Sequence, residues 1–190
     1  DGAAELRNHT DRLQHTNQVG DHQLWVAGHS YGTVLVGEAA KGGHGLNADG
    51  IINLGSPGLR VDDVSGLILK GEHQTPGDAP VHTMTRSDDP IRIVDKARQL
   101  HLDRFGIGHG LMPDHPEFGG RMWDVDGGPH RDPHNAYFDR DSVALHNIAD
   151  IVAGGEPPPR LPQNEHGGEP GSGHHDSGRT GDDVIGHHDV

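Results

Sequence analysis

Ser30 stands between two glycines in the segment Gly28-His29-Ser30-Tyr31-Gly32, which fits the pattern G-x-S-x-G. The apolar run QLWVA precedes it and the segment YGTVLVGEAA follows, which predicts a buried strand and then a helix. Between a strand and a helix, this pattern is typical of a strained turn that holds a serine hydroxyl clear of a sheet. Ser30 is therefore the candidate nucleophile. The N–H of Tyr31, at the helix start, is the candidate oxyanion donor.

The two glycines of the motif are expected to let strand and helix approach without a Cβ clash. The alternative interpretation is an ordinary strand–helix turn with a harmless hydroxyl. A second serine, Ser56 in NLGSPG, also follows an apolar run, but Pro57 after it has no N–H to stabilise an oxyanion. We interpret Ser56 as part of a turn on the rim of the site, and His29 as a packing residue that points away from it.

A serine hydroxyl needs a base, and the base needs an orienting carboxylate. After this type of motif the partners follow in the order acid, then histidine. The segment VHTMTRSDDPI offers Asp88 and Asp89 at the end of a predicted strand. Asp89 is favoured because Pro90 holds it out of helical geometry. The alternative is that both are solvated turn residues.

The histidine should lie between the last predicted strand, RMWDV, and the last predicted helix. His134 and His130 qualify among the 18 histidines of the chain. His134, in PHNAYFD, is the candidate base and His130 the runner-up, whereas His146 falls inside the helix and is expected to be structural.

A metal site is the competing interpretation of this region, because His130 and His134 are four residues apart in a loop with three aspartates. These aspartates are Asp124, Asp126 and Asp132. The loop nevertheless completes no known ligand motif, and the EF-hand pattern from Asp124 fails because Asn135 stands at its twelfth position. The paired histidines near the C-terminus could bind a metal only weakly. We expect neither a functional metal nor a cofactor.

Strand-like and helix-like segments alternate along the chain, which predicts an α/β fold with a mostly parallel sheet flanked by helices. Residues 92–120 interrupt the alternation and could be a cap over an acyl pocket or a solvated loop. Val61, Val64, Leu67 and Ile68 fit a further short helix. The expected strands are QLWVA, IINLG, APVHTM and RMWDV; the expected helices cover residues 3–19, 31–41 and 141–154.

The best of these helices is DSVALHNIADIVAGG, for which Asp141 is the expected cap and Gly154 the expected end. Its apolar residues recur at helical spacing and predict one buried face: Leu145, Ile148, Ala149 and Val152. Three aromatic residues are expected in the core rather than at a substrate: Trp25, Phe118 and Trp123.

The chain is acidic, with a formal charge of −14 from 29 acidic and 15 basic residues. This balance argues against nucleic acid and against an anionic membrane surface. No apolar run is long enough to span a bilayer, and the absence of cysteine excludes disulfides. The cellular location is not specified, although a cytoplasmic one is favoured. The expected partner is a small-molecule substrate, whose acyl chemistry is implied only by the resemblance described below.

We predict a domain over residues 1–154 and a disordered tail over residues 155–190. The tail holds 8 Gly, 5 Pro and 5 His but four apolar side chains. Such a segment cannot bury enough surface to offset the entropy of ordering.

The motifs VAGHSYGTVLVGEAA, ADGIINLGSPG, SDDPI, HPEFGGRMWDVD and HNAYFDRDSVALHNIADIV occur in an order that resembles the α/β-hydrolases. The similarity is greatest to an actinobacterial group of unknown function and covers about residues 20 to 154. It implies a Ser-His-Asp hydrolase acting on esters or related acyl compounds, and it places His134 at the histidine position.

The resemblance also implies that the N-terminal strands of such a fold are lacking here, together with the loop that carries a second oxyanion donor. We therefore expect self-association through an exposed sheet edge and weak catalysis. The alternative function is a non-catalytic, hydrolase-like binding domain or an inactive fragment.

Overall fold

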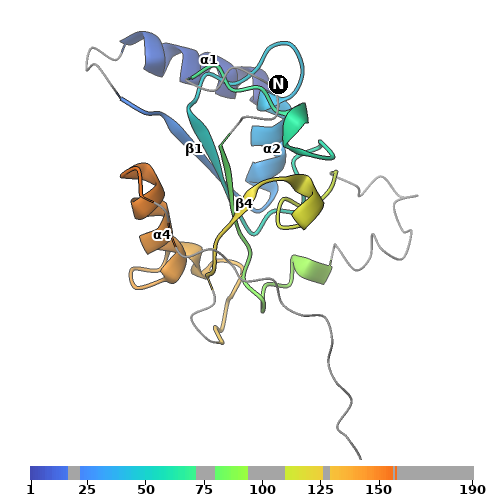
Figure 1. Cartoon of the computed structure of the whole chain (residues 1–190), viewed down its shortest axis with the longest axis vertical. Coiled ribbons are helices and arrows are strands. Elements are labelled where there is room, and N and C mark those ends of the chain that lie inside the picture. Colours follow the sequence, from blue (N-terminus) through green and yellow to red (C-terminus); the bar gives the residue numbers. More distant parts are fainter. Residues whose placement is uncertain (17–21, 72–79, 94–109, 126–128, 156, 158–190) are drawn as a thin grey trace, which may run out of the picture.

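The computed structural model describes residues 1–16, 22–71, 80–93, 110–125, 129–155 and 157. Figure 1 shows a sheet with helices on both sides. The strands are β1 (Trp25–His29), β2 (Gly50–Leu54), β3 (Val81–Met84) and β4 (Arg121–Met122). The α-helices are α1 (Gly2–Thr16), α2 (Tyr31–Ala40) and α4 (Val143–Val152), and three 3-10 turns are η1 (Val64–Gly66), η3 (Pro116–Phe118) and η4 (Ala136–Phe138).

The four strands form one parallel sheet in the order β1-β2-β3-β4, which confirms the predicted α/β class. All five residues of β2 are buried, as expected of an apolar strand covered on both faces. Because parallel strands end at the same edge, the segments that follow β1, β2 and β3 meet there. Ser30, Gly55 and the loop with Asp89 are thereby brought together.

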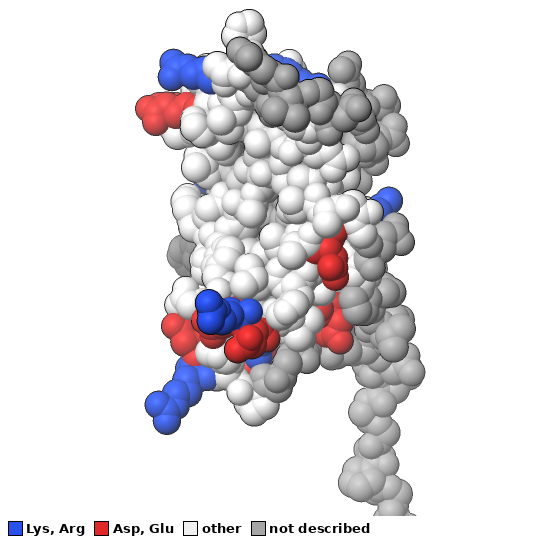
Figure 2. Space-filling model, turned by 90° about the vertical axis from the view of Figure 1, so that its left-hand side faces the viewer, with Lys and Arg blue, Asp and Glu red and all other residues white. Residues whose placement is uncertain are grey.

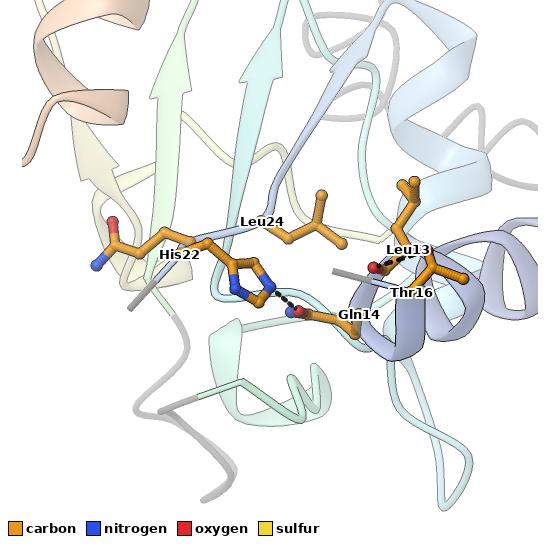
Figure 3. A pocket seen from close by; sticks show the side chains of 6 residues that line it. Leu13, Gln14, Thr16, His22 and Leu24 are labelled. Atoms are coloured by element: carbon orange, nitrogen blue, oxygen red, sulfur yellow. Dashed lines mark hydrogen bonds between the residues drawn. The ribbon is translucent and has the colours of Figure 1, made fainter. Parts of the chain in front are cut away.

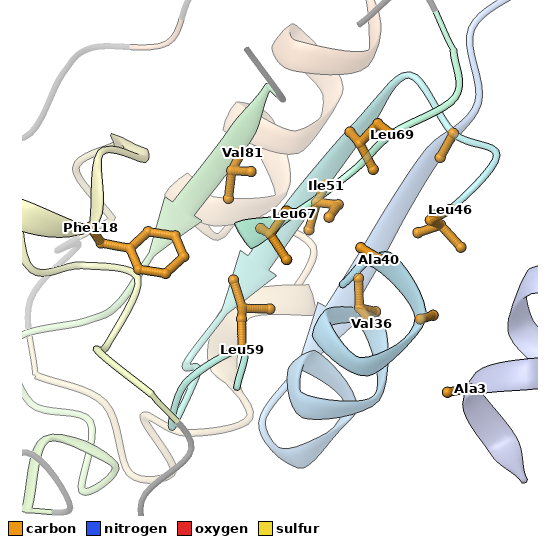
Figure 4. Packing of buried hydrophobic residues seen from close by; sticks show 12 residues of the cluster. Ala3, Val36, Ala40, Leu46, Ile51, Leu59, Leu67, Leu69, Val81 and Phe118 are labelled. Atoms are coloured by element: carbon orange, nitrogen blue, oxygen red, sulfur yellow. The ribbon is translucent and has the colours of Figure 1, made fainter. Parts of the chain in front are cut away.

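Alternate residues of β2 face two separate cores. Ile51 packs with residues of α1 and α2 on one face (Figure 4). Ile52 packs with Ala144 and Ile151 of α4 on the other. The three aromatic residues assigned to the core lie there: Phe118 and Trp123 are buried, and Trp25 packs against the α4 core.

Helix α4 differs from its prediction in its cap and its buried face. Ser142, not Asp141, is the N-cap, because its side chain accepts a hydrogen bond from the N–H of Leu145. The buried residues are Ala144, Asn147 and Ile151, whereas Ala149 and Val152 of the predicted face are exposed. The polar Asn147 is buried because its amide donates to the carbonyl of Asp124, a contact that an apolar pattern does not reveal. Gly154 follows the helix end at φ 80°, as a stop signal should.

Two other predicted segments are corrected or only partly described. Within residues 61–68, Val64–Gly66 form the short 3-10 turn η1 rather than a longer helix. Leu67 follows this turn, bridges to Lys41 and is buried in the core beside α2. Within the predicted insertion, Met112 and Phe118 are buried, but residues 94–109, including Phe105 and Ile107, lie outside the described residues. The predicted disordered tail lies outside them too, apart from residues 155 and 157.

Strand β1 pairs with β2 on one side, and no strand of the described part of the chain lies on the other. The N–H of Ser30 and the carbonyl of Leu24 both point toward β2. By alternation, the backbone groups of Trp25, Ala27 and His29 point to the opposite side. Ala27 is exposed, and Figure 2 shows few charged side chains in the middle of the face on the left of Figure 1.

Candidate active site

Ser30 occupies the turn between β1 and α2 in a conformation that non-glycine residues rarely adopt, with φ 55° and ψ −130°. Its backbone N–H is fixed by the carbonyl of Leu54 at 2.9 Å. Its carbonyl accepts both the N–H and the hydroxyl of Thr33, at 3.0 and 2.7 Å. These bonds hold the strained turn in place on the strand side and the helix side.

The two glycines of the motif are not equivalent. A Cβ added to Gly28 would lie 2.9 Å from Cα of Thr33, so strand and helix approach too closely for any side chain there. At Gly32 an added Cβ meets no heavy atom of the described structure within 4 Å. The expected need for glycine therefore holds at Gly28 but not at Gly32. Another close approach lies at Gly37, where a Cβ would meet the carbonyl oxygen of Leu59.

The three predicted site residues, which are far apart in the sequence, form one hydrogen-bonded chain. His134 Nε2 lies 2.7 Å from Ser30 Oγ, and His134 Nδ1 lies 2.9 Å from Asp89 Oδ1. A carboxylate only accepts hydrogen bonds, so Nδ1 carries the proton and Nε2 accepts from the serine hydroxyl. This geometry allows the imidazole to take the hydroxyl proton. The proximity is a structural observation, whereas the catalytic roles of the three residues remain a prediction.

Asp89 is the carboxylate in contact with the histidine, and its side chain is fully buried. Besides His134, its oxygens accept from the N–H of Ile91 at 2.8 Å and from the hydroxyl of Tyr137 at 2.6 Å. These donors satisfy the oxygens of a carboxylate that is shielded from water.

The two alternatives left open by the sequence lie elsewhere. Asp88 pairs with Arg86 Nε at 2.9 Å, and the hydrogen bond from Arg86 holds the pKa of Asp88 below its usual value. The ring of His130 lies 2.9 Å from a carboxylate oxygen of Asp139 and is partly exposed. Asp88 accepts a backbone N–H from His130 at 3.2 Å, so these two residues help to fix the histidine loop.

Two residues that hold the His134 loop in place were missed or misjudged from the sequence. His29 does not point away from the site: its Nε2 lies 2.6 Å from the carbonyl oxygen of His134, and the two rings are 4.9 Å apart. Tyr137 was not singled out, although its position in AYFD, three residues after His134, was available as a clue. Both attach the histidine loop to the sheet.

Ser56 is completely buried rather than on a rim. Its hydroxyl lies 2.7 Å from that of Thr33 and accepts the N–H of Gly58 at 3.1 Å. It therefore braces the turn after β2 against α2.

Tyr31 is the first residue of α2, so its N–H lies at the positive end of the helix dipole, beside Ser30.

A cleft of about 290 Å³ lies between the end of α1 and the start of β1, lined by Leu13, Gln14, Thr16, His22, Gln23 and Leu24 (Figure 3). It includes none of the three predicted site residues.

Within the described ranges, no group of three or more His, Asp or Glu side chains could hold a metal ion. Asp126, one of the three aspartates in the loop with His130 and His134, lies outside these ranges. No described helix has the length and apolar character needed to cross a membrane.

Comparison with curated proteins finds relatives in one bacterial species. Two uncharacterized proteins of Mycobacterium tuberculosis, Rv2079 of strain H37Rv and MT2140 of strain CDC 1551, are each 29% identical to the chain over 164 residues. The match covers 80% of this chain and 24% of each relative, so the chain spans about a quarter of their length. No solved structure gives a significant match.

A family model described as an alpha/beta hydrolase matches residues 1–98, which is more than half of the 190 residues. The matched region contains Ser30 and Asp89, and His134 follows it. The parallel sheet flanked by helices is the architecture that this family predicts. The chain therefore belongs to the α/β-hydrolase family.

Proposed function

We propose that the chain is a serine hydrolase that cleaves carboxylic esters or related acyl compounds through an acyl-enzyme. The observation that carries the proposal is His134, which contacts Ser30 Oγ at 2.7 Å through one ring nitrogen and Asp89 at 2.9 Å through the other. A histidine placed between a serine on a strained turn and a buried carboxylate is the arrangement that activates a hydroxyl.

The reaction begins when Ser30 Oγ attacks the acyl carbon and its proton passes to His134 Nε2. The imidazolium that forms is stabilised by the Asp89 carboxylate, which stays ionised. The oxyanion receives the N–H of Tyr31, at the positive end of α2. When the bond to the alcohol breaks, His134 returns its proton to the leaving oxygen, and the acyl group remains on Ser30.

Deacylation repeats these steps with water. His134 takes a proton from the water molecule, whose oxygen attacks the acyl carbon, and the Oγ–acyl bond breaks as the proton is returned to Ser30. The products are a carboxylic acid and an alcohol. No cofactor takes part, since every proton and bond is accounted for by these side chains and water.

The test is covalent labelling with a fluorophosphonate probe, which reacts with an activated serine. The wild-type chain is expected to be labelled, and Ser30→Ala to be unlabelled because the attacking oxygen is gone. Ser65→Ala, which removes an exposed serine in η1, is the matched control and should label like the wild type. A folded wild-type chain without label would favour the non-catalytic binding domain.

A further inference from the structure

Asp89 Oδ2 accepts a hydrogen bond that the steps above do not use. The hydroxyl of Tyr137 lies 2.6 Å from it, whereas His134 Nδ1 is 3.1 Å from the same oxygen and closer to Oδ1. The carboxylate is therefore held by an imidazole and by a phenol, in addition to the N–H of Ile91, which donates to Oδ1.

The direction of this hydrogen bond follows from its surroundings. The backbone N–H of Arg86 donates to the Tyr137 oxygen at 3.1 Å, so the phenolic hydrogen is directed to Asp89. Burial, and next the bond to Asp89, raise the pKa of the Tyr137 phenol far above its usual value. The phenol thus stays protonated and remains a donor around neutral pH.

The Tyr137–Asp89 pair is closely packed by its surroundings. Tyr137 is fully buried, and its ring also lies 5.7 Å from that of His29. Below the pair is Gly55, at φ 51°, where an added Cβ would lie 2.8 Å from Asp89 Oδ2 and 3.1 Å from the Tyr137 ring. The chain has a glycine where any side chain would displace the carboxylate or the phenol.

We propose that Tyr137 is a positioning residue that fixes the rotation of the Asp89 carboxylate and shares its negative charge with His134. This role rests on the proposed function, because it acts through the Asp89–His134 contact. A donor that takes part of the carboxylate charge leaves less of it to stabilise the imidazolium. Tyr137 therefore limits how strongly His134 holds its proton, while keeping Oδ1 aimed at Nδ1.

Removing only the hydroxyl, as Tyr137→Phe does, should have two effects. The carboxylate becomes a stronger acceptor, so the pKa of His134 should rise, by about half a pH unit or more. The carboxylate also loses one of the donors that fix its orientation, although the N–H of Ile91 still donates to Oδ1. We therefore expect kcat to fall about tenfold with little change in KM. The acid limb of the pH–rate profile should move to higher pH by the same amount as the His134 titration.

The side chains of the other titratable groups near this pair make no hydrogen bond to the Tyr137 hydroxyl that the substitution removes. His29 faces His134 from β1, and Arg86 is held beside Asp88 and the carbonyl of Val125 at the end of β3. The difference between wild type and Tyr137→Phe therefore isolates the phenol.

The experiment follows the His134 ring by NMR across pH, with His134→Gln to assign its signal, and measures turnover of a p-nitrophenyl ester in parallel. Thr10→Val is the matched control, because it removes another buried hydroxyl, bonded to Arg7 in α1, and should shift neither quantity. Incorporation of 3-fluorotyrosine, whose phenol donates more strongly, should shift the His134 pKa downward and tests the idea without deleting a group.

An unchanged His134 titration in folded Tyr137→Phe, or an unchanged titration with 3-fluorotyrosine, would overturn the proposal. The NMR arm does not depend on turnover. A chain without esterase activity but with the expected titration shifts would refute the hydrolase function and retain the Tyr137 contact to Asp89.

Discussion

At the scale of single residues, the account depends on which histidine contacts Ser30. His134→Ala should lower ester turnover by about 10⁴-fold or more, and Ser30→Ala with His134→Ala should be little worse, because the two act as one unit. His130→Ala should retain most activity, since its ring contacts Asp139 rather than the serine. Steady-state kinetics measure all of these variants. An inactive His130→Ala variant beside an active His134→Ala variant would reverse the assignment of the base.

Chain order and local context predicted that Ser30, Asp89 and His134 lie together, because each follows a predicted strand at the same edge of a parallel sheet. The structure brings these side chains together, and their catalytic roles stay a prediction. Tyr137 and His29 were harder to place. Their contacts depend on how the loop after β4 folds back over the site, and neither residue type has a spacing rule that signals a contact to a carboxylate or a carbonyl.

At the scale of elements, β3 and β4 are joined by a buried polar pair. His82 is stacked on Trp123, and its Nδ1 accepts the indole N–H at 2.7 Å. Burial, and then the charge of Arg121, lower the pKa of His82 from 6.5 to about 4. Protonation would also set an N–H against the indole N–H. The folded chain therefore keeps His82 neutral at a pH where the unfolded chain protonates it.

This difference predicts acid sensitivity. Because the pKa of His82 is lower in the folded chain than in the unfolded chain, its contribution to the free energy of unfolding is fully present above about pH 6.5. That contribution is lost as the pH drops toward 4, by about 3 kcal/mol in all. His82→Gln keeps an acceptor for Trp123 but cannot titrate, so its unfolding midpoint should depend less on pH in this window. His9→Gln, on exposed α1, is the control. Equal pH dependence in His82→Gln and wild type would contradict the prediction.

Elements were predicted more accurately than their faces. The period of apolar residues identified α4, but Asn147 faces the core because its amide has a partner, and this rotates the buried stripe by one residue. The segment 61–68 has apolar spacing for a helix, yet Leu67 and Leu69 are buried by bridges to α2's end and the following loop rather than by helical packing. In both cases tertiary contacts override local periodicity.

At the scale of the whole molecule, the outer side of β1 is the feature that should govern solution behaviour. Its outward N–H and C=O groups are a template for pairing with another strand. We expect residues 1–190 to self-associate, and Ala27→Lys, which places a charge on this edge, to reduce association. Ala149→Lys adds the same charge to exposed α4 and should not. Analytical ultracentrifugation measures the association state of the wild-type chain and of the two variants. A monomeric wild-type chain with ordinary esterase rates would contradict the expectation of an open edge.

The central claim is that Ser30 is an activated nucleophile. The most direct measurement is peptide mapping by mass spectrometry of the chain labelled with the fluorophosphonate. The account predicts a single phosphonyl adduct on Ser30 that is abolished by Ser30→Ala and strongly slowed by His134→Ala. A folded chain that carries no adduct, or one that carries it on Ser56 or another serine, would contradict it.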